Sequence, residues 1–286
     1  MGAKKENKQM KTFRLIGAAL LAVLMCANFA SCSKDDDAAT TDGGGNDEGG
    51  NQEVTVSEKK LVKMVSNDET YTFSYDDEGR LNSATDTYSY DDGSYSEKSK
   101  YSYKFIWGDD AVVVKYEYER ESDYIYGGGT TGTGTYTYSL KDGLVQSYVD
   151  DDNDKGTYSY NNSNRLIKAE FTSKGWTINA VWDKDKLVSV KTSDTYGPYT
   201  SSILTYGETC KKGYFPLISN IIELEEVLFM AHPEIVGIRT NQLPNTYSPY
   251  DEEISMTYEY DKEGYISKIK MKNEDGDSDT YTLTWK

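Results

Sequence analysis

The sequence has few of the residues on which many catalytic sites and cross-linked folds depend. Its 286 residues include three cysteines, five prolines and a single histidine, His232. A multi-histidine zinc site therefore cannot form, and any Ser-His-Asp or Cys-His arrangement would have to use His232. Cys26 and Cys32 lie near the N-terminus, and Cys210 alone lies in the main body, so a disulfide framework is excluded there. The fold must depend on a hydrophobic core.

Positive charge is also scarce. The chain has 31 Lys and Arg against 48 Asp and Glu, which gives a formal net charge of -17. A surface of this sign repels the phosphate backbone of nucleic acids. We therefore expect no nucleic-acid partner.

The N-terminal residues have the order of a bacterial export signal. Lys11 and Arg14 give a positive start before an apolar run, residues 15–27, and small residues follow before Cys32. The run is too short for a comfortable membrane-spanning helix. We expect residues 1–31 to be a signal peptide, with Met10 as an alternative start.

The end of this segment predicts a lipid anchor. Residues 29–32, FASC, resemble a bacterial lipobox, and the following 33-SKDDD-37 resembles the surface-export signal of lipoproteins from Bacteroides-type bacteria. We expect acyl chains such as palmitate on Cys32, which would hold the protein at the outer membrane, at the cell surface or alternatively on the periplasmic side. Residues 32–53 would be the lipidated cysteine and an acidic, Gly-rich tether. The open alternatives are an ordinary secretory signal and a plain solvated spacer.

The rest of the chain, residues 54–286, repeats one short unit. An aromatic residue ends the first half, four or five turn residues follow, and an aliphatic residue opens the second half. Period-2 alternation places Tyr71 and Phe73 on one face of the first half, and Gly79 suits its turn. The clearest copies are 71–84, 156–169, 177–190 and 256–269.

Such repeated hairpins predict a mainly β protein with a single domain. Short loops force antiparallel neighbours, so we expect a large curled up-and-down meander of about a dozen strands, an open or half barrel. Residues 219–232 break the pattern and predict one helix, with Asn220 and Glu223 at capping-box spacing. Because this helix would be apolar around most of its circumference, it should be buried and should plug or cover the sheet.

Taken together, these features resemble a family of Bacteroides-type lipoproteins that carry a domain of unknown function. The resemblance lies in the lipobox, the acidic tether, the Tyr-rich hairpins, 226-EVLF-229 and 241-NQLP-244. It implies a porin-like fold, meaning a curved β-meander that does not form a membrane pore. The family carries no established activity, so the resemblance implies no catalytic residues.

No motif for a known chemistry stands out. The acidic runs 150–154 and 273–279 do not fit an EF-hand loop, and the Gly-rich residues 127–134 lack the lysine of a phosphate loop. We expect His232 to bond a backbone carbonyl at the helix end and Cys210 to be an idle thiol. The prediction is therefore no enzyme, no metal and no cofactor, although abundant carboxylates leave a glycosidase-like hydrolase as an alternative.

Aromatic residues near turns remain as candidate ligand-binding groups. Flat rings beside acids could stack on sugar faces or anchor a protein. We predict non-enzymatic binding of a glycan or an envelope protein, with a purely structural envelope role as a further alternative. The candidate residues are Tyr124, Tyr126, Trp176, Tyr196 and Tyr199.

Overall fold

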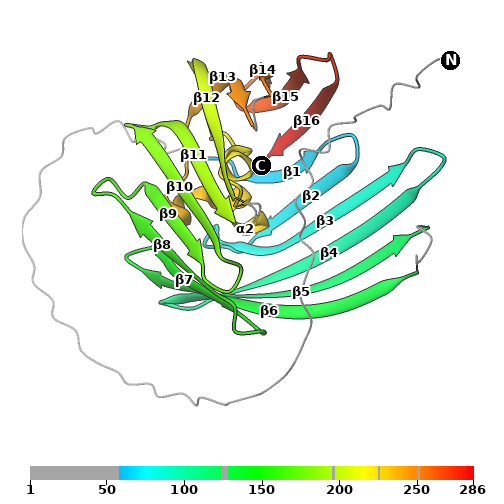
Figure 1. The fold of residues 1–286 in the computed structure, drawn as a ribbon, viewed down its shortest axis with the longest axis vertical. Helices are drawn as coiled ribbons and strands as arrows, with labels where there is room; N and C mark the ends of the chain where they lie inside the picture. The colour runs from blue at the N-terminus through cyan, green and yellow to red at the C-terminus, as the bar shows by residue number, and fades with distance from the viewer. Residues whose placement is uncertain (1–57, 124–127, 195–196, 225, 250–251) are drawn as a thin grey trace, which may run out of the picture.

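The protein is a closed β-barrel with a helical insert. The computed structural model describes residues 58–123, 128–194, 197–224, 226–249 and 252–286. Within these ranges sixteen antiparallel strands follow one another around the barrel, and β1 pairs with β16 to close it (Figure 1). The predicted β-meander is confirmed, whereas the prediction of about a dozen strands in an open or half barrel is wrong. Pairing the first strand with the last removes both sheet edges.

The strands differ in length around the barrel. Four long strands, β3 to β6, lie early in the chain and form one broad curved wall (Figure 1), while β12, with 13 residues, is the longest of the sixteen. The strands are β1 (Leu61–Val65), β2 (Glu69–Tyr75), β3 (Leu81–Asp91), β4 (Ser96–Trp107), β5 (Ala111–Ser122), β6 (Thr130–Lys141), β7 (Leu144–Asp150), β8 (Lys155–Tyr160), β9 (Leu166–Phe171), β10 (Trp176–Asp183), β11 (Lys186–Asp194), β12 (Gly197–Thr209), β13 (Gln242–Ser248), β14 (Ile254–Tyr260), β15 (Ile266–Asn273) and β16 (Ser278–Trp285).

The helical insert connects β12 to β13. It contains two short helices, α1 (Ile218–Ile221) and α2 (Val227–Ala231), and a 3-10 turn, η2 (Pro233–Val236). The single helix predicted over 219–232 is therefore wrong, because Glu223 adopts a φ of 62° and interrupts it. Asn220 lies inside α1, so the expected capping box does not form. No helix in the described part of the chain is long and apolar enough to cross a membrane.

The insert is buried inside the barrel, as the apolar pattern predicts. Every residue of α2 is buried, and the Phe229 ring lies 5.3 Å from that of Tyr138 on β6 and 6.3 Å from that of Tyr158 on β8. Hydrophobic burial of this kind is the main stabilising term of the fold. We call the end of the barrel that holds the insert and the repeated hairpin turns the helix end, and the opposite end the loop end.

The repeated hairpins all turn at the helix end, and their aromatic residue has a specific partner. In the first copy, Asp76 accepts backbone hydrogen bonds from Glu78 and Arg80 across the turn. A register shift beside Tyr75 marks a β-bulge, and the Tyr75 hydroxyl donates to the carbonyl of Leu61 at 2.7 Å. The same contact to the preceding strand recurs for Trp107, Tyr160, Trp182, Tyr206, Tyr258 and Trp285.

The outer face of the barrel is polar. On β5, for example, Lys115, Glu117 and Glu119 are exposed, while Val112 and Val114 on the opposite face are buried. The large hydrophobic side chains that are exposed in the described residues are Ile106, Ile167, Val181 and Val188. They are too few to form the continuous apolar band of a lipid-embedded barrel. Apolar residues instead point inward to the insert.

Candidate functional site

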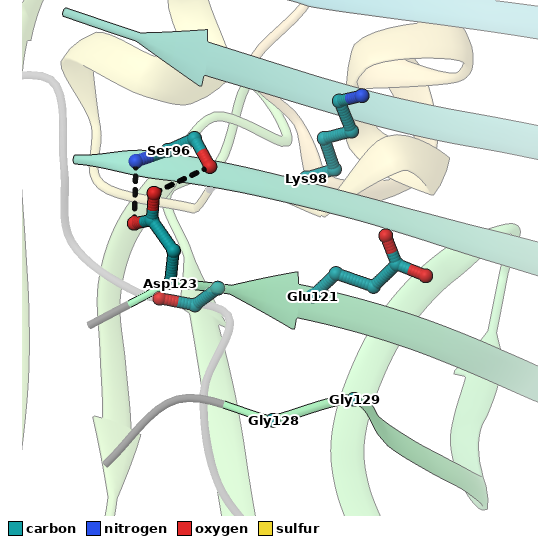
Figure 2. A pocket seen from close by; sticks show the side chains of 7 residues that line it. Ser96, Lys98, Glu121, Asp123, Gly128 and Gly129 are labelled. Carbon is teal, nitrogen blue, oxygen red and sulfur yellow. Dashed lines mark hydrogen bonds between the residues drawn. The ribbon is translucent and has the colours of Figure 1, made fainter. Parts of the chain in front are cut away.

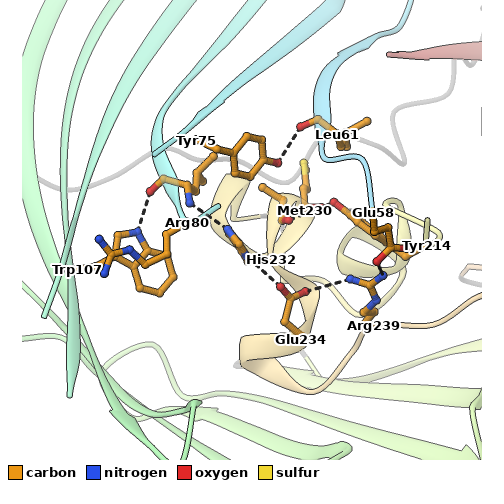
Figure 3. A network of polar contacts seen from close by, with 12 residues as sticks. Glu58, Leu61, Tyr75, Arg80, Trp107, Tyr214, Met230, His232, Glu234 and Arg239 are labelled. Atoms are coloured by element: carbon orange, nitrogen blue, oxygen red, sulfur yellow. Dashed lines mark hydrogen bonds and ion pairs between the residues drawn. The ribbon is translucent and has the colours of Figure 1, made fainter. Parts of the chain in front are cut away.

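A polar network at the helix end ties the insert to the barrel (Figure 3). The imidazole Nε2 of His232 accepts a hydrogen bond of 2.9 Å from the backbone N–H of Leu81. A neutral ring that accepts at Nε2 must carry its proton at Nδ1, which then donates to Glu234 Oε1 at 2.8 Å. His232 thus accepts a hydrogen bond from a backbone N–H of β3, and the prediction that it bonds a backbone carbonyl at the helix end is wrong. The sequence feature that points to this contact is the repeated turn, because it leaves the Leu81 N–H without a partner inside its own hairpin.

The network continues through Arg239 to the start of the barrel. Arg239 pairs with Glu58 at 2.6 Å and stacks on the Tyr214 ring, with its guanidinium carbon 5.1 Å from the centroid. Burial tends to raise the pKa of Glu234, but the His232 hydrogen bond and the Arg239 charge hold that pKa below its ordinary value. Each charge here has a partner within the protein, which is the arrangement expected of a structural contact. We assign the network to stability and not to ligand binding.

A second feature is a shallow cleft at the loop end (Figure 2). It has a volume of about 350 Å³ and is lined by Ser96, Lys98, Glu121, Ser122, Asp123, Gly128 and Gly129. Asp123 accepts hydrogen bonds from the backbone and hydroxyl of Ser96. The lining contains no aromatic residue, so it lacks the apolar surface typical of small-molecule sites.

The strongest candidate site is a row of tyrosines on the inner face of the long strands. We define the tyrosine wall as Tyr101 and Tyr103 of β4, Tyr116 and Tyr118 of β5, and Tyr136 of β6. Neighbouring rings follow one another closely: centroids are 5.5 Å apart for Tyr101–Tyr118 and 6.2 Å for Tyr103–Tyr116. The first four are only partly buried, so these residues keep accessible surface on the inner face of the barrel.

Two glycines make room for these rings. Gly132 and Gly134 on β6 pair with Tyr118 and Tyr116 across the strand boundary. A Cβ at Gly134 would lie 2.5 Å from the Tyr116 ring, and one at Gly132 would lie 2.4 Å from that of Tyr118. The rings therefore lie flat along the wall over glycine backbone, an arrangement in which each presents a face to the interior.

Carboxyl groups lie beside the tyrosine wall. Asp86 on β3 is the direct cross-strand neighbour of Tyr71 on β2 and of Tyr101 on β4. Its Oδ1 is buried and has no hydrogen-bond partner within the described ranges. Burial and the charge of Glu69 raise the pKa of Asp86 to about 8. An uncharged carboxyl with free hydrogen-bonding capacity thus lies next to a tyrosine stack.

A second carboxyl lies at the base of the wall. Glu226, which precedes α2, accepts a hydrogen bond of 2.9 Å from the Tyr136 hydroxyl. Burial raises the pKa of Glu226, and the Tyr136 hydrogen bond and the charge of Lys174 oppose this rise only in part. Its side chain is surrounded by barrel atoms but keeps accessible surface, as expected for a group that faces the barrel interior.

The structure describes two of the five predicted ligand-binding aromatics. Trp176 stacks on Phe171 at 4.9 Å and packs against the core, while Tyr199 pairs with Thr192 on the neighbouring strand. Strand alternation places both on the inner face at the loop end. Thr192 is 3% exposed, and its hydroxyl has no partner within the described part of the chain. Tyr124, Tyr126 and Tyr196 lie outside the described residues, as do Cys32, the signal segment and the tether.

Cys210 and the two acidic runs make contacts typical of residues that stabilise the fold. Cys210 is buried and close to the carbonyls of Asn241 and Gly213, and burial raises the pKa of its thiol to about 11, so it is poorly reactive. In the acidic runs, Asp150 and Asn273 bond the backbone of their own turns. No group of three or more metal-ligating side chains occurs in the described residues.

Comparison with known proteins supports the fold. No protein-family model matches the chain, and no curated protein matches its sequence. Among solved structures, a porin-like protein from Bacteroides uniformis is 17% identical, with a TM-score of 0.58 over 80% of this chain and 97% of that one. A porin-like protein from Bacteroides vulgatus is 10% identical over 80% of this chain and 85% of that one, with a TM-score of 0.26. The first likeness shows a porin-like β-barrel fold.

Proposed function

We propose that this protein is a lipid-anchored, non-enzymatic binding protein of the bacterial outer membrane whose tyrosine wall takes a carbohydrate. The observation that carries the proposal is the row of half-buried tyrosine faces laid over Gly132 and Gly134. Core packing does not require accessible ring faces, whereas ligand sites are commonly lined by aromatic surface with a few placed polar groups.

Carbohydrate fits this surface better than a protein partner does. The apolar C–H face of a sugar matches a flat ring, and its hydroxyls suit the carboxyls of Asp86 and Glu226 beside the wall. The hydroxyls of Tyr103, Tyr116 and Tyr118 make no hydrogen bond to other residues that the structure describes, so they too are available. A folded protein partner would have to insert a large convex surface into the barrel to reach these rings, because stable protein–protein interfaces bury extensive surface.

Anchoring through Cys32 is consistent with the polar outer face of the barrel. The lipobox-like FASC and the acidic SKDDD supply the anchor and favour the cell surface over the periplasmic side. A porin-like barrel with exposed Lys115 and Glu117 on its outside gains nothing from insertion into lipid. Substitution Cys32→Ala should release the protein from the membrane fraction, and unchanged membrane retention would contradict the anchor.

The binding proposal is tested with the purified chain on a glycan array, followed by calorimetry with the best ligand. Tyr118→Ala should weaken binding about tenfold. A flat ligand group stacked on one aromatic side chain contributes on the order of 1–3 kcal/mol where nucleic-acid bases are bound in this way, and we expect a similar or smaller effect for a sugar face. Thr133→Ala, on the outer face of β6, is the matched control and should bind normally. If no glycan binds while an envelope protein is captured at the same wall, the ligand class is protein.

A second candidate, a glycosidase-like hydrolase, is favoured by one observation. Asp86 has a pKa of about 8 and lies near Glu69, which is the kind of carboxyl pair in which one group stays protonated as a general acid. Incubation with the bound oligosaccharide separates the two functions. Release of new reducing ends that Asp86→Asn abolishes would make the protein an enzyme.

A further inference from the structure

Glu226 lies where the helical insert meets the tyrosine wall. It precedes α2, whose Phe229 packs against Tyr138, and its carboxylate bonds Tyr136. Tyr136 in turn pairs with Asp150, the last residue of the shorter strand β7. The long strands β3 to β6 continue past this level toward the loop end (Figure 1). Through its bond to Tyr136, Glu226 therefore lies at the base of the surface that they form.

The Glu226 carboxylate has no cationic partner in the described part of the chain. Among the described residues its hydrogen-bond partner is the neutral hydroxyl of Tyr136. The charge of the exposed Lys174 on the β9–β10 turn acts on it without forming an ion pair. Two other enclosed acids have such a partner: Glu97 pairs with Arg120 at 2.9 Å, and Glu234 bonds His232. A buried carboxylate that lacks a counter-charge is costly, and it attracts any cation that can reach it.

Aromatic groups surround this carboxylate. Burial raises the phenol pKa of Tyr103, Tyr136, Tyr138, Tyr148 and Tyr158, and the charge of Glu226 raises each of them further. The rings of Tyr136, Tyr138 and Tyr148 lie within 5.8 Å of one another, centroid to centroid. Tyrosine faces attract ammonium groups through the ring quadrupole, and phenol oxygens accept hydrogen bonds from them. The overall charge of -17 further raises the local concentration of cations.

We propose that Glu226 receives a protonated amino group of the ligand, so that the tyrosine wall selects amino sugars over neutral or N-acetylated sugars. The proposal rests on the proposed carbohydrate-binding function and specifies its substrate class. The sugar ring would stack on the wall, while its ammonium group donates to Glu226 among the surrounding tyrosines. The carboxylate would then gain the counter-charge that the chain itself does not supply.

The test compares four probes by calorimetry with the purified protein at neutral pH. A glucosamine tetramer should bind about ten- to a hundredfold more tightly than its N-acetylated form and than cellotetraose, the range expected for one charge-assisted contact. Cadaverine, an amine without a sugar, should bind weakly at the same carboxylate. Glu226→Gln should abolish the preference for the amine.

Matched variants exclude non-specific attraction to an acidic protein. Glu119→Gln removes the same charge from the exposed outer face and should keep the preference, while Tyr136→Phe should weaken it with the ring in place. Equal affinity for the amino and N-acetylated tetramers, or a preference that survives in Glu226→Gln, overturns the proposal and leaves carbohydrate binding intact. Binding of cadaverine alone at Glu226 would support the cation site and reject the carbohydrate. Failure of every probe rejects both.

Discussion

Replacement of His232 by Phe tests whether the helical insert is held by one buried hydrogen bond. His232 is 6% exposed, and its ring lies 5.8 Å from that of Tyr75 and 5.6 Å from that of Trp107, both in edge-on geometry. Phe keeps the ring and these contacts but removes both nitrogens. The Leu81 amide then loses its acceptor.

The expected loss of stability follows from these contacts. An unsatisfied buried amide costs about 1–3 kcal/mol, and the bond to the partly exposed Glu234 adds less than about 1 kcal/mol. The free energy of unfolding should therefore fall by about 2–3 kcal/mol, and Tm by about 5–10 °C for a domain of this size. Urea unfolding followed by tryptophan fluorescence measures the first quantity, and thermal circular dichroism measures the second.

A companion variant isolates the amide bond. Glu234→Gln keeps an oxygen that can accept from His232 Nδ1, so it should cost under about 1 kcal/mol. A His232→Phe loss below about 0.5 kcal/mol would refute the reasoning, because the Leu81 amide would then have found another acceptor. An equal loss in both variants would also refute it, since the His232–Glu234 hydrogen bond and not the bond to the Leu81 amide would then hold the insert.

Three further predictions concern the wall and the hairpins. Tyr75→Phe removes a hydroxyl-to-carbonyl hydrogen bond and should cost about 1 kcal/mol in urea unfolding. Gly134→Ala should displace the Tyr116 ring and weaken glycan binding in calorimetry, whereas Gly128→Ala, which meets no atom within 4 Å, should leave binding unchanged. Because the pKa of Asp86 is about 8 in the folded protein and near 4 when unfolded, ionising it disfavours folding as pH rises from 4 to 8. Asp86→Asn should therefore be stabilised relative to the parent by a few kcal/mol at pH 9 but not at pH 4, in urea titrations at both pH values, and equal shifts at both would contradict the raised pKa.

The hairpin framework could be predicted from sequence, but the interior could not. Spacing alone placed Tyr75 and Leu81 at the ends of paired strands, because turn chemistry and period 2 are local. Barrel closure depends on β1 meeting β16, a contact between the two ends of the domain that no local pattern encodes. The interrupted helix depends on the φ of Glu223, and Glu is not a residue that marks a left-handed position.

In the candidate site, too, local sequence patterns predict some features, whereas others depend on long-range contacts. Alternation along β3 assigns Asp86 to the inner face together with Tyr88, yet an acid at one position of a Tyr-rich strand looks like a solvated residue until its neighbours are known. Glu226 was visible only as part of a helix-like segment, because its contact with Tyr136 joins residues 90 positions apart. Long-range contacts of this kind give a carboxyl its pKa and function, and sequence spacing does not contain them.

Tyrosine has two separate roles in this barrel, and the difference explains why the repeat concealed the site. At the helix end, register shifts mark bulges beside Leu61 on β1 and Val145 on β7, and Tyr75 and Tyr160 donate their hydroxyls to the carbonyls of these two residues. Further along the long strands the ladders run without a register shift, so Tyr103 and Tyr116 meet no such carbonyl. Their hydroxyls and ring faces are left for other partners, while the same alternation along the strand makes both kinds look alike in sequence. Tyr103 and Tyr116 of the tyrosine wall do not close a hairpin and are only partly buried, and we therefore expect a ligand to bind on them.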